Sequence, residues 1–210
     1  MSDVILYDYW RSSACYRVRI VLNLKGIAYR AEQVDLVEGE QVDDDYISIN
    51  PQALIPALAI DGHVLTQSLA IIDYLDAMVS EPRMVSRDPA ARAKTLARAL
   101  TLVADVHPLN NLRVLNRLRA DFGADGSTVH RWAAGWIARG FEALEAEAPD
   151  SGLFGGDAPD LSDVCLVPQM YSARRFDLDF YDYPKLCRID AQLRAMDAFA
   201  HAAPEAVHVG

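Results

Sequence analysis

Cysteine is scarce in this sequence of 210 residues, which contains only Cys15, Cys165 and Cys187. Three widely separated cysteines are too few for a disulfide framework and do not have the paired spacing of a zinc site. The acidic stretch from Glu38 to Asp45 has no His or Cys within it, so we interpret it as a solvated edge rather than a metal cluster. We therefore expect a cytoplasmic protein that binds no metal.

Basic charge and long hydrophobic runs are also in short supply. Lys and Arg number 20 against 30 Asp and Glu, which gives a net charge of −10. Because affinity for nucleic acid depends on basic patches, this balance argues against a nucleic-acid partner. The apolar runs are shorter than the about 18 residues of a membrane span, and the opening MSDVILYDYW has no basic segment before an apolar core. We expect neither a membrane segment nor a signal peptide.

The hydrophobic content is sufficient for sizeable cores, and a chain of this length accommodates two small domains. The first elements are a strand candidate from Val4 to Tyr9, a helix that ends at Gly26, and a second strand from Tyr29 to Leu36. Apolar residues spaced four apart at Tyr16, Ile20 and Leu24 predict that helix, which follows the loop that begins at Arg11. The β-α-β order favours a parallel pairing of the two strands.

A hairpin and a further helix are expected next. Ile55-Pro56 precedes a third strand, Asp61-Gly62 is a two-residue hairpin signal, and His63 to Thr66 returns as a fourth strand. A helix follows from Leu69 to about Met78. This order is that of the thioredoxin fold, in which a proline at the position of Pro56 is typically cis and leaves the backbone of Ile55 able to pair with an extended peptide.

Strand signals are missing from the rest of the chain, which is predicted to be all-α. Residues 90–119 have helical composition with a break at His107-Pro108, and residues 127–148 form a second helix. Asp160 and Asp163 have the spacing of a helix cap, and Tyr183-Pro184 opens a last short helix. We predict an α/β thioredoxin-like domain over residues 1–80, a linker over 81–89 and an all-α domain over 90–210.

Ser12 and Ser13 stand where the first helix begins. Hydroxyl groups and unpaired backbone N–H groups at a helix start, with the positive end of the helix dipole, favour a bound thiolate or carboxylate. The alternative is that the two serines only cap the helix. This stretch alone leaves both interpretations open.

An ordered set of motifs resembles the zeta class of the glutathione transferases, whose namesake activity is maleylacetoacetate isomerase. The motifs are YWRSS at 9–13, RVRI at 17–20, Asn50-Pro51, Ile55-Pro56, Gln67-Ser68, HPLNN at 107–111, LVPQ at 166–169 and Arg175-Phe176. The HPLNN motif also resembles the bacterial maleylpyruvate isomerases. One position departs from the family pattern, because Ala14 occupies the place of a common cysteine and Cys15 follows one residue later. We interpret Cys15 as a small buried hydrophobic residue.

The resemblance implies glutathione as cofactor and assigns site residues. Ser12 would donate a hydrogen bond to the glutathione sulfur and so favour its thiolate. The other residues implied to hold the tripeptide are Ser13, Gln41, Ile55, Gln67, Ser68, His107 and Asn111. The substrate would be a small cis-enedioic dianion, for which Arg11, Arg113 and Arg175 are the candidate carboxylate ligands. The resemblance also implies a homodimer.

These implications lead to a hypothesis with two rivals. The chain is interpreted as a glutathione-dependent cis–trans isomerase of maleylacetoacetate or maleylpyruvate, and the sequence does not choose between the two substrates. One rival is a general glutathione transferase that conjugates or dehalogenates small electrophiles. The other is a non-enzymatic binding protein that keeps the fold for partner contacts.

Overall fold

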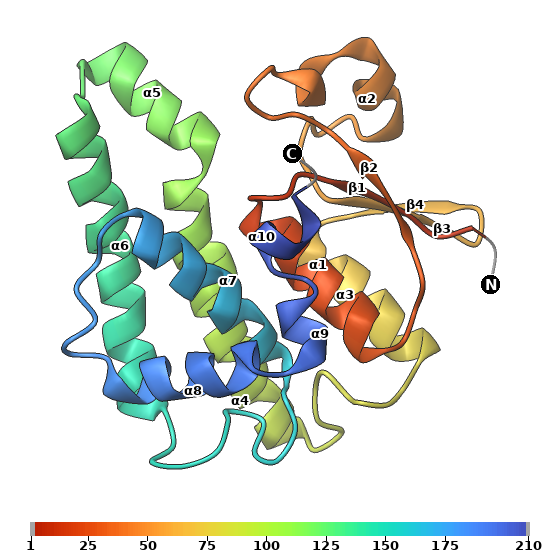
Figure 1. The fold of residues 1–210 in the computed structure, drawn as a ribbon, viewed down its shortest axis with the longest axis vertical. Coiled ribbons are helices and arrows are strands. Elements are labelled where there is room, and N and C mark those ends of the chain that lie inside the picture. The colour runs from red at the N-terminus through yellow and green to blue at the C-terminus, as the bar shows by residue number, and fades with distance from the viewer. Residues whose placement is uncertain (1–2, 209–210) are drawn as a thin grey trace. The chain divides into compact units, whose positions relative to one another are not determined.

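The computed structural model describes residues 3–208, and within them the chain forms two compact units. The first unit combines the chain up to Met84 with the segment from Ala195 onward, and the second extends from Val85 to Arg194 (Figure 1). The segment from Ala195 was expected to belong with the helices of residues 90–210, but it clusters with the first unit.

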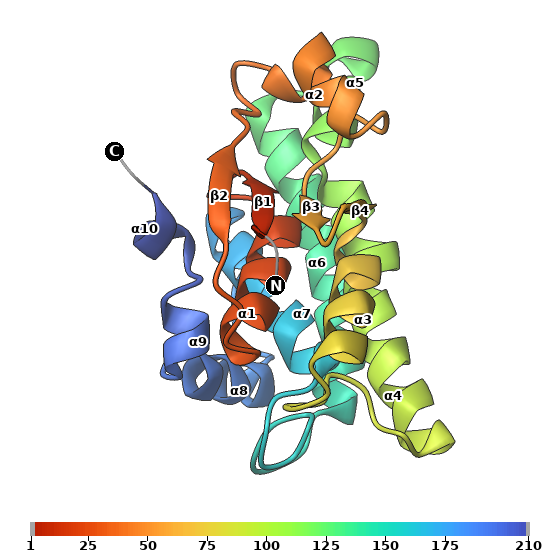
Figure 2. The same ribbon diagram turned by 90° about the vertical axis from the view of Figure 1, so that its right-hand side faces the viewer.

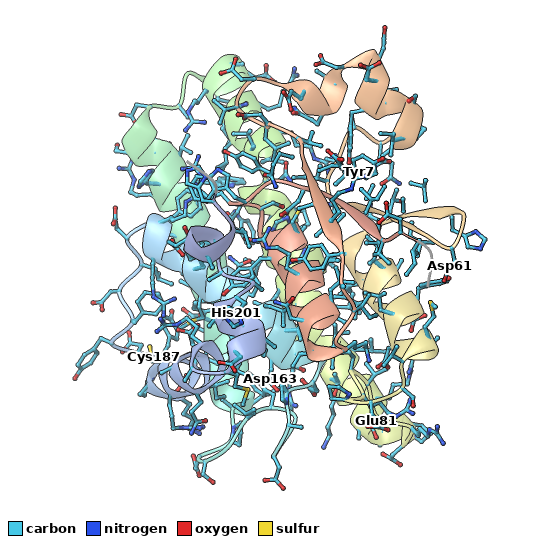
Figure 3. All side chains as sticks on the ribbon, turned by 45° about the vertical axis from the view of Figure 1, so that its right-hand side comes forward. Tyr7, Asp61, Glu81, Asp163, Cys187 and His201 are labelled. Atoms are coloured by element: carbon cyan, nitrogen blue, oxygen red, sulfur yellow. The ribbon has the colours of Figure 1, made fainter. Side chains whose placement is uncertain are left out.

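The first unit is built on a four-stranded sheet with the strand order β2-β1-β3-β4, which Figure 2 shows from left to right. Strands β1 (Ile5–Asp8) and β2 (Arg30–Gln33) are parallel, as the β-α-β order predicted. Strand β3 (Ala57–Ile60) is antiparallel to β1 and to β4 (His63–Thr66). Both turn residues of the β3–β4 hairpin have positive φ, 49° at Asp61 and 79° at Gly62, which confirms the predicted two-residue turn (Figure 3).

Helices α1 (Ser13–Leu24) and α3 (Ser68–Met78) pack against each other in this unit. Short elements complete it: η1 (Glu40–Val42), α2 (Asp44–Ile49), α9 (Asp197–Ala200) and α10 (Pro204–Val207). The core is formed by fully buried aliphatic side chains of the sheet and of both long helices, namely Leu6, Val18, Ile20, Leu22, Leu58, Ile71 and Leu75.

The end of α1 follows the predicted glycine stop. Gly26 has φ 62°, and the amide of Ile27 donates to the carbonyl of Leu22, as in a Schellman motif. The ammonium of Lys25 does not donate to the carbonyls at the end of α1, however. It is buried, forms an ion pair of 2.8 Å with Asp76 of α3 and donates to the carbonyl of Val79 at the end of that helix.

The second unit is entirely helical apart from an isolated bridge between Leu153 and Gly156. Its elements are α4 (Pro89–Leu100), the π-helical turn η2 (Thr101–Val106), the 3₁₀ turn η3 (His107–Asn110), α5 (Leu112–Phe122), α6 (Gly126–Glu147), α7 (Leu161–Arg175) and α8 (Pro184–Arg194). The expected break at His107-Pro108 is confirmed, because regular α-helix stops at Leu100 and resumes at Leu112. Helix α7 packs against α4 and α8.

The predicted cap at the start of α7 is confirmed. Asp160 accepts hydrogen bonds from the amides of Ser162 and Asp163, and the Asp163 carboxylate accepts one of 3.0 Å from the amide of Asp160. Asp163 also receives the amides of Phe154 and Gly155, so one buried carboxylate serves three donors (Figure 3). Phe141 of α6 is fully buried in the core, whereas Trp132 and Trp136 of the same helix are half-buried.

Candidate functional site

The strand register brings several predicted site residues to one end of the sheet. Strand β1 runs toward the start of α1, where Ser12 stands. Because β3 is antiparallel to β1 and Tyr7 pairs with Ala57, Ile55 lies at this same end. The last residue of β4, Thr66, also pairs with Ala57, so Gln67 follows there as well. The topology of the first unit therefore gathers three predicted glutathione ligands.

Ser12 is the N-cap of α1, and its Oγ accepts a hydrogen bond of 3.3 Å from the amide of Cys15. The capping interpretation is thus confirmed, but it does not exclude the other one. A hydroxyl accepts through a lone pair and keeps its own hydrogen as a donor. Ser12 can cap α1 and at the same time donate to a thiolate held at the positive end of the helix dipole.

Cys15 is buried completely, which confirms its interpretation as a small core residue. Burial raises the pKa of its thiol above the usual range, and the nearby Asp8 carboxylate raises this pKa further, against the lowering effect of Arg19. A buried, protonated thiol is a poor nucleophile. The chemistry therefore needs another source of thiolate.

Arg11 lies on the loop between β1 and Ser12 and is half-buried. Its guanidinium carbon stands 5.0 Å from the centre of the Trp10 ring, and one of its nitrogens is 3.5 Å from the hydroxyl of Tyr9. A cation above an indole face is held in orientation while its N–H groups stay available to a ligand. This arrangement suits the predicted contact with a substrate carboxylate.

The backbone of Ile55 is available for pairing. The Ile55-Pro56 peptide bond is cis, as expected from the fold. Within residues 3–208, neither the amide nor the carbonyl of Ile55 has a hydrogen-bond partner. The carbonyl of the preceding residue, Leu54, is held by Tyr46 at 2.7 Å and by Asn50 at 2.6 Å. The loop is thus fixed immediately before the residue expected to bind a peptide.

Gln67 and Ser68 form the start of α3. Gln67 has φ 69° and ψ 115°, a conformation that side chains rarely adopt and that is frequent at binding sites. Its side-chain Nε2 donates a hydrogen bond of 3.0 Å to Oε1 of Gln52. Ser68 is buried at the first position of the helix, where free N–H groups suit a carboxylate.

Arg17 was not among the predicted site residues, but it contacts one of them. Its side chain is buried, and its Nε donates a hydrogen bond of 3.1 Å to Oγ of Ser68. The available signal was an arginine inside the apolar run of α1, which is unusual for a helix packed in a core. Gln41, on η1, has a buried Oε1 that finds no partner among residues 3–208, whereas Ser13 is half-buried in the first turn of α1.

Three further predicted residues are close together in the second unit. His107 opens η3, Asn111 follows it, and the Asn111 Oδ1 accepts a hydrogen bond of 3.1 Å from the amide of Arg113 to cap α5. The side chain of Arg113 is exposed, and its guanidinium has no ion-pair or hydrogen-bond partner in the described part of the chain. It is therefore available to an anionic ligand.

Helix α6 holds the turn that contains His107. The Nε1 of Trp132 donates to the carbonyl of Leu109 at 2.9 Å. A Cβ added to Gly140 would lie 2.5 Å from Cγ2 of Val106, so a glycine is required for this close approach. Arg175 is the last residue of α7 and is exposed, and the next residue, Phe176, packs its ring against His130 of α6. The start of α6 thus contacts Leu109, four residues before Arg113, and Phe176, the residue after Arg175.

The chain is similar to known proteins in sequence and in structure. Residues 2–77 match the family model described as the N-terminal domain of glutathione S-transferase. The chain is 48% identical to a probable maleylacetoacetate isomerase of Vibrio cholerae, with 98% of this chain and 97% of that protein covered. No helix among residues 3–208 has the length and apolar character needed to cross a bilayer.

Two solved structures are similar over nearly the whole chain. One is a maleylpyruvate isomerase described as a bacterial zeta-class glutathione S-transferase, with a TM-score of 0.94, 42% identity and coverage of 96% and 97% of the two chains. The other is a maleylacetoacetate isomerase of Methylobacterium extorquens AM1, solved with bound malonate and glutathione, with a TM-score of 0.90, 36% identity and coverage of 97% and 98%.

Proposed function

This chain belongs to the maleylacetoacetate and maleylpyruvate isomerase family of zeta-class glutathione transferases, and on that premise we propose that it is a glutathione-dependent cis–trans isomerase of a maleyl dianion. The observation that carries the proposal is Ser12, which caps α1 and retains a hydroxyl donor at the end of the sheet where Ile55 and Gln67 also lie. Glutathione is the cofactor.

The binding step uses groups of the first unit. The backbone of Ile55 pairs with glutathione as an extended peptide, and the start of α3 at Ser68 binds a carboxylate. Gln41, Ser13 and Gln67 complete the contacts to the tripeptide from this unit. From the second unit, His107 and Asn111 contribute further polar contacts. In this proposal residues 1–80 are the glutathione-binding domain, and the helices of the second unit, which ends at Arg194, bind the substrate.

The reaction needs the thiolate of glutathione and no acid–base side chain at its centre. The Ser12 hydroxyl and the α1 dipole favour the thiolate over the thiol. The sulfur adds to one carbon of the cis double bond, and the displaced electron pair moves to the conjugated carbonyl oxygen as an enolate. The bond between the two former alkene carbons is now single and rotates. The enolate electrons then return, the C–S bond breaks, and the trans double bond and the thiolate are both regenerated.

Arginines supply the electrostatic part of catalysis. The substrate has two carboxylates, and the protein has a net charge of −10, so attraction has to be local. Arg11, Arg113 and Arg175 are proposed to hold the carboxylates and the developing enolate, because a guanidinium offers a planar pair of donors. The Methylobacterium protein was solved with both malonate and glutathione bound, which supports a dicarboxylate ligand in addition to the cofactor.

The wider setting follows from the same proposal. Maleyl dianions of this kind are products of aromatic ring cleavage, so the enzyme would act in aromatic catabolism in the cytoplasm. We propose a homodimer with two-fold symmetry, the commonest arrangement of soluble oligomers. Sedimentation at micromolar concentration would contradict the dimer if it gave a monomer near 23.2 kDa.

Steady-state assays on maleylacetoacetate and maleylpyruvate at saturating glutathione test the proposal. We expect turnover of at least one of the two, and the ratio of their kcat/KM values identifies the preferred substrate. A general transferase would instead conjugate uncharged electrophiles and leave both dianions unchanged. Glutathione binding without any turnover would favour the non-enzymatic interpretation.

A further inference from the structure

The C-terminal segment of the first unit, residues 195–208, is attached to α1. Side chains of α1 donate hydrogen bonds to the backbone of this segment. Helix α9 lies beside α1 (Figure 1). The donors are spread over two turns of α1 and form three bonds: Tyr16 hydroxyl to Phe199 O at 3.4 Å, Arg19 Nε to Ala202 O at 3.0 Å, and Asn23 Nδ2 to Ala198 O at 3.0 Å. Backbone carbonyls accept each bond, so the segment is held in a defined register along α1.

Arg19 connects this segment to the loop that precedes α1. The side chain is fully buried. Its Nη1 forms an ion pair of 2.6 Å with Asp8 at the end of β1, and its Nη2 donates to the carbonyl of Trp10 at 2.9 Å. With the bond from Nε to Ala202, one guanidinium joins the end of β1, the loop and the C-terminal segment.

The far end of the segment reaches the same loop from the other direction. The rings of His208 and Trp10 are stacked, with centroids 4.1 Å apart and planes at 6°. The indole of Trp10 also lies under the guanidinium of Arg11, and Ser12 is the next residue. Nothing in the reaction proposed above uses Arg19, Trp10 or His208, yet all three fix the loop that contains Arg11 and Ser12.

We propose that residues 195–208 are a positioning element of the active site, in which His208 orients Arg11 through Trp10. This inference rests on the proposed function, because it assigns Arg11 to a carboxylate of the dianion. The stacked imidazole restricts the indole, and the indole is the surface on which the guanidinium lies. If the indole were not held by His208, Arg11 would keep its charge but its guanidinium would lose its fixed orientation. A two-point contact with a carboxylate depends on that orientation.

The test compares His208→Ala and His208→Phe with His201→Ala as the matched control. His201 is in the same segment and is exposed (Figure 3). For His208→Ala we expect isomerase kcat/KM to fall by about tenfold, with conjugation of an uncharged chlorodinitrobenzene almost unchanged. His208→Phe keeps a flat ring and should restore most of the loss, and His201→Ala should equal the wild type.

Three outcomes overturn the inference: wild-type isomerase efficiency in His208→Ala, equal losses in both activities, or no rescue by His208→Phe. A second readout separates this inference from the proposed function. Malonate titrated into each glutathione-loaded variant reports dicarboxylate binding without turnover, and we expect weaker binding in His208→Ala alone. If the wild type bound malonate in this way but isomerised neither dianion, the proposed function would fail while the positioning role stood. Equal malonate affinity in all four proteins would show that His208 does not orient Arg11.

Discussion

Arg17 donates a hydrogen bond of 3.1 Å from Nε to Oγ of Ser68, and both side chains are buried where α1 meets the start of α3. This bond occupies a lone pair of the Ser68 hydroxyl, so its hydrogen is directed elsewhere. The start of α3 therefore offers a hydroxyl donor and free N–H groups, with the positive charge of Arg17 behind them. These three features suit the carboxylate of a bound tripeptide.

Replacing Arg17 should accordingly weaken glutathione binding more than chemistry. In Arg17→Lys the charge is kept but the bond from Nε is lost, so Ser68 is no longer oriented. We expect the Kd for glutathione, measured by calorimetry, to rise about fivefold to tenfold, in line with the loss of one hydrogen bond. Turnover at saturating glutathione should change little. Arg139→Lys, exposed on α6, is the control, and an unchanged Kd in Arg17→Lys would exclude the role.

Ser12→Ala should instead slow turnover much more than it weakens glutathione binding. The variant loses a hydrogen bond to a charged sulfur, worth about 1.5–3 kcal/mol, so turnover should fall roughly tenfold to more than a hundredfold. It also loses the cap to the amide of Cys15, so melting temperature has to be measured alongside. Glutathione affinity should be nearly retained. Cys15→Ala should keep its rate, because its buried thiol is not the nucleophile. Wild-type turnover in Ser12→Ala at saturating glutathione would remove Ser12 from the mechanism.

Arginine-to-lysine changes separate isomerisation from conjugation. Arg113→Lys and Arg175→Lys keep the charge but lose the planar pair of donors, so isomerase kcat/KM should fall by at least about tenfold. Conjugation of an uncharged electrophile should be unaffected. Arg117→Lys is the control on α5, because Arg117 is exposed and already paired with Asp121 at 2.7 Å. An intact isomerase rate in the first two variants would make the general transferase the better interpretation.

The stability of the helical unit should depend on Asp163. Asparagine at this position offers one acceptor oxygen to three backbone amides, so Asp163→Asn should lower the free energy of unfolding by about 1–3 kcal/mol. Urea unfolding followed by circular dichroism measures this change. Unaltered stability would mean that the three hydrogen bonds do not contribute.

The same carboxylate should produce a pH dependence. Burial raises the pKa of Asp163 to about 7, and the Asp160 charge raises it too, against the lowering effect of the three amide donors. The pKa of an aspartate in the unfolded chain is about 3.9. The full stabilising contribution of Asp163 is therefore present only below that pH. The contribution is lost as pH rises through about 7. The stability gap between wild type and Asp163→Asn should therefore be narrower at about pH 8 than at about pH 5, and a wider gap at the higher pH would contradict this.

Local patterns were the part of the structure that the sequence predicted well. The Asp61-Gly62 turn, the Asp160–Asp163 cap and the glycine stop at Gly26 each depend on a few consecutive residues. Ser12, Ile55 and Gln67 lie at the same end of the sheet because β3 is antiparallel to both β1 and β4, and the hairpin signal indicated the second of these pairings.

Long-range pairs of buried polar residues were not predictable in this way. Lys25 pairs with Asp76 and Arg17 pairs with Ser68, and the two partners are 51 residues apart in both cases. Residues 195–208 are attached to α1 through hydrogen bonds that their backbone carbonyls accept. Every residue type has a backbone carbonyl, so the sequence of the segment does not indicate this attachment. Composition and periodicity contain no information about such partners.

The balance of thiol during turnover tests whether glutathione is a cofactor that adds to the double bond and leaves again. Purified enzyme is given a limiting amount of glutathione and a large excess of the maleyl dianion, and trans product and free thiol are measured together. We expect many product molecules per glutathione, no product without glutathione, and total thiol unchanged at the end. One thiol consumed per substrate molecule would contradict it, and would make this protein a conjugating transferase.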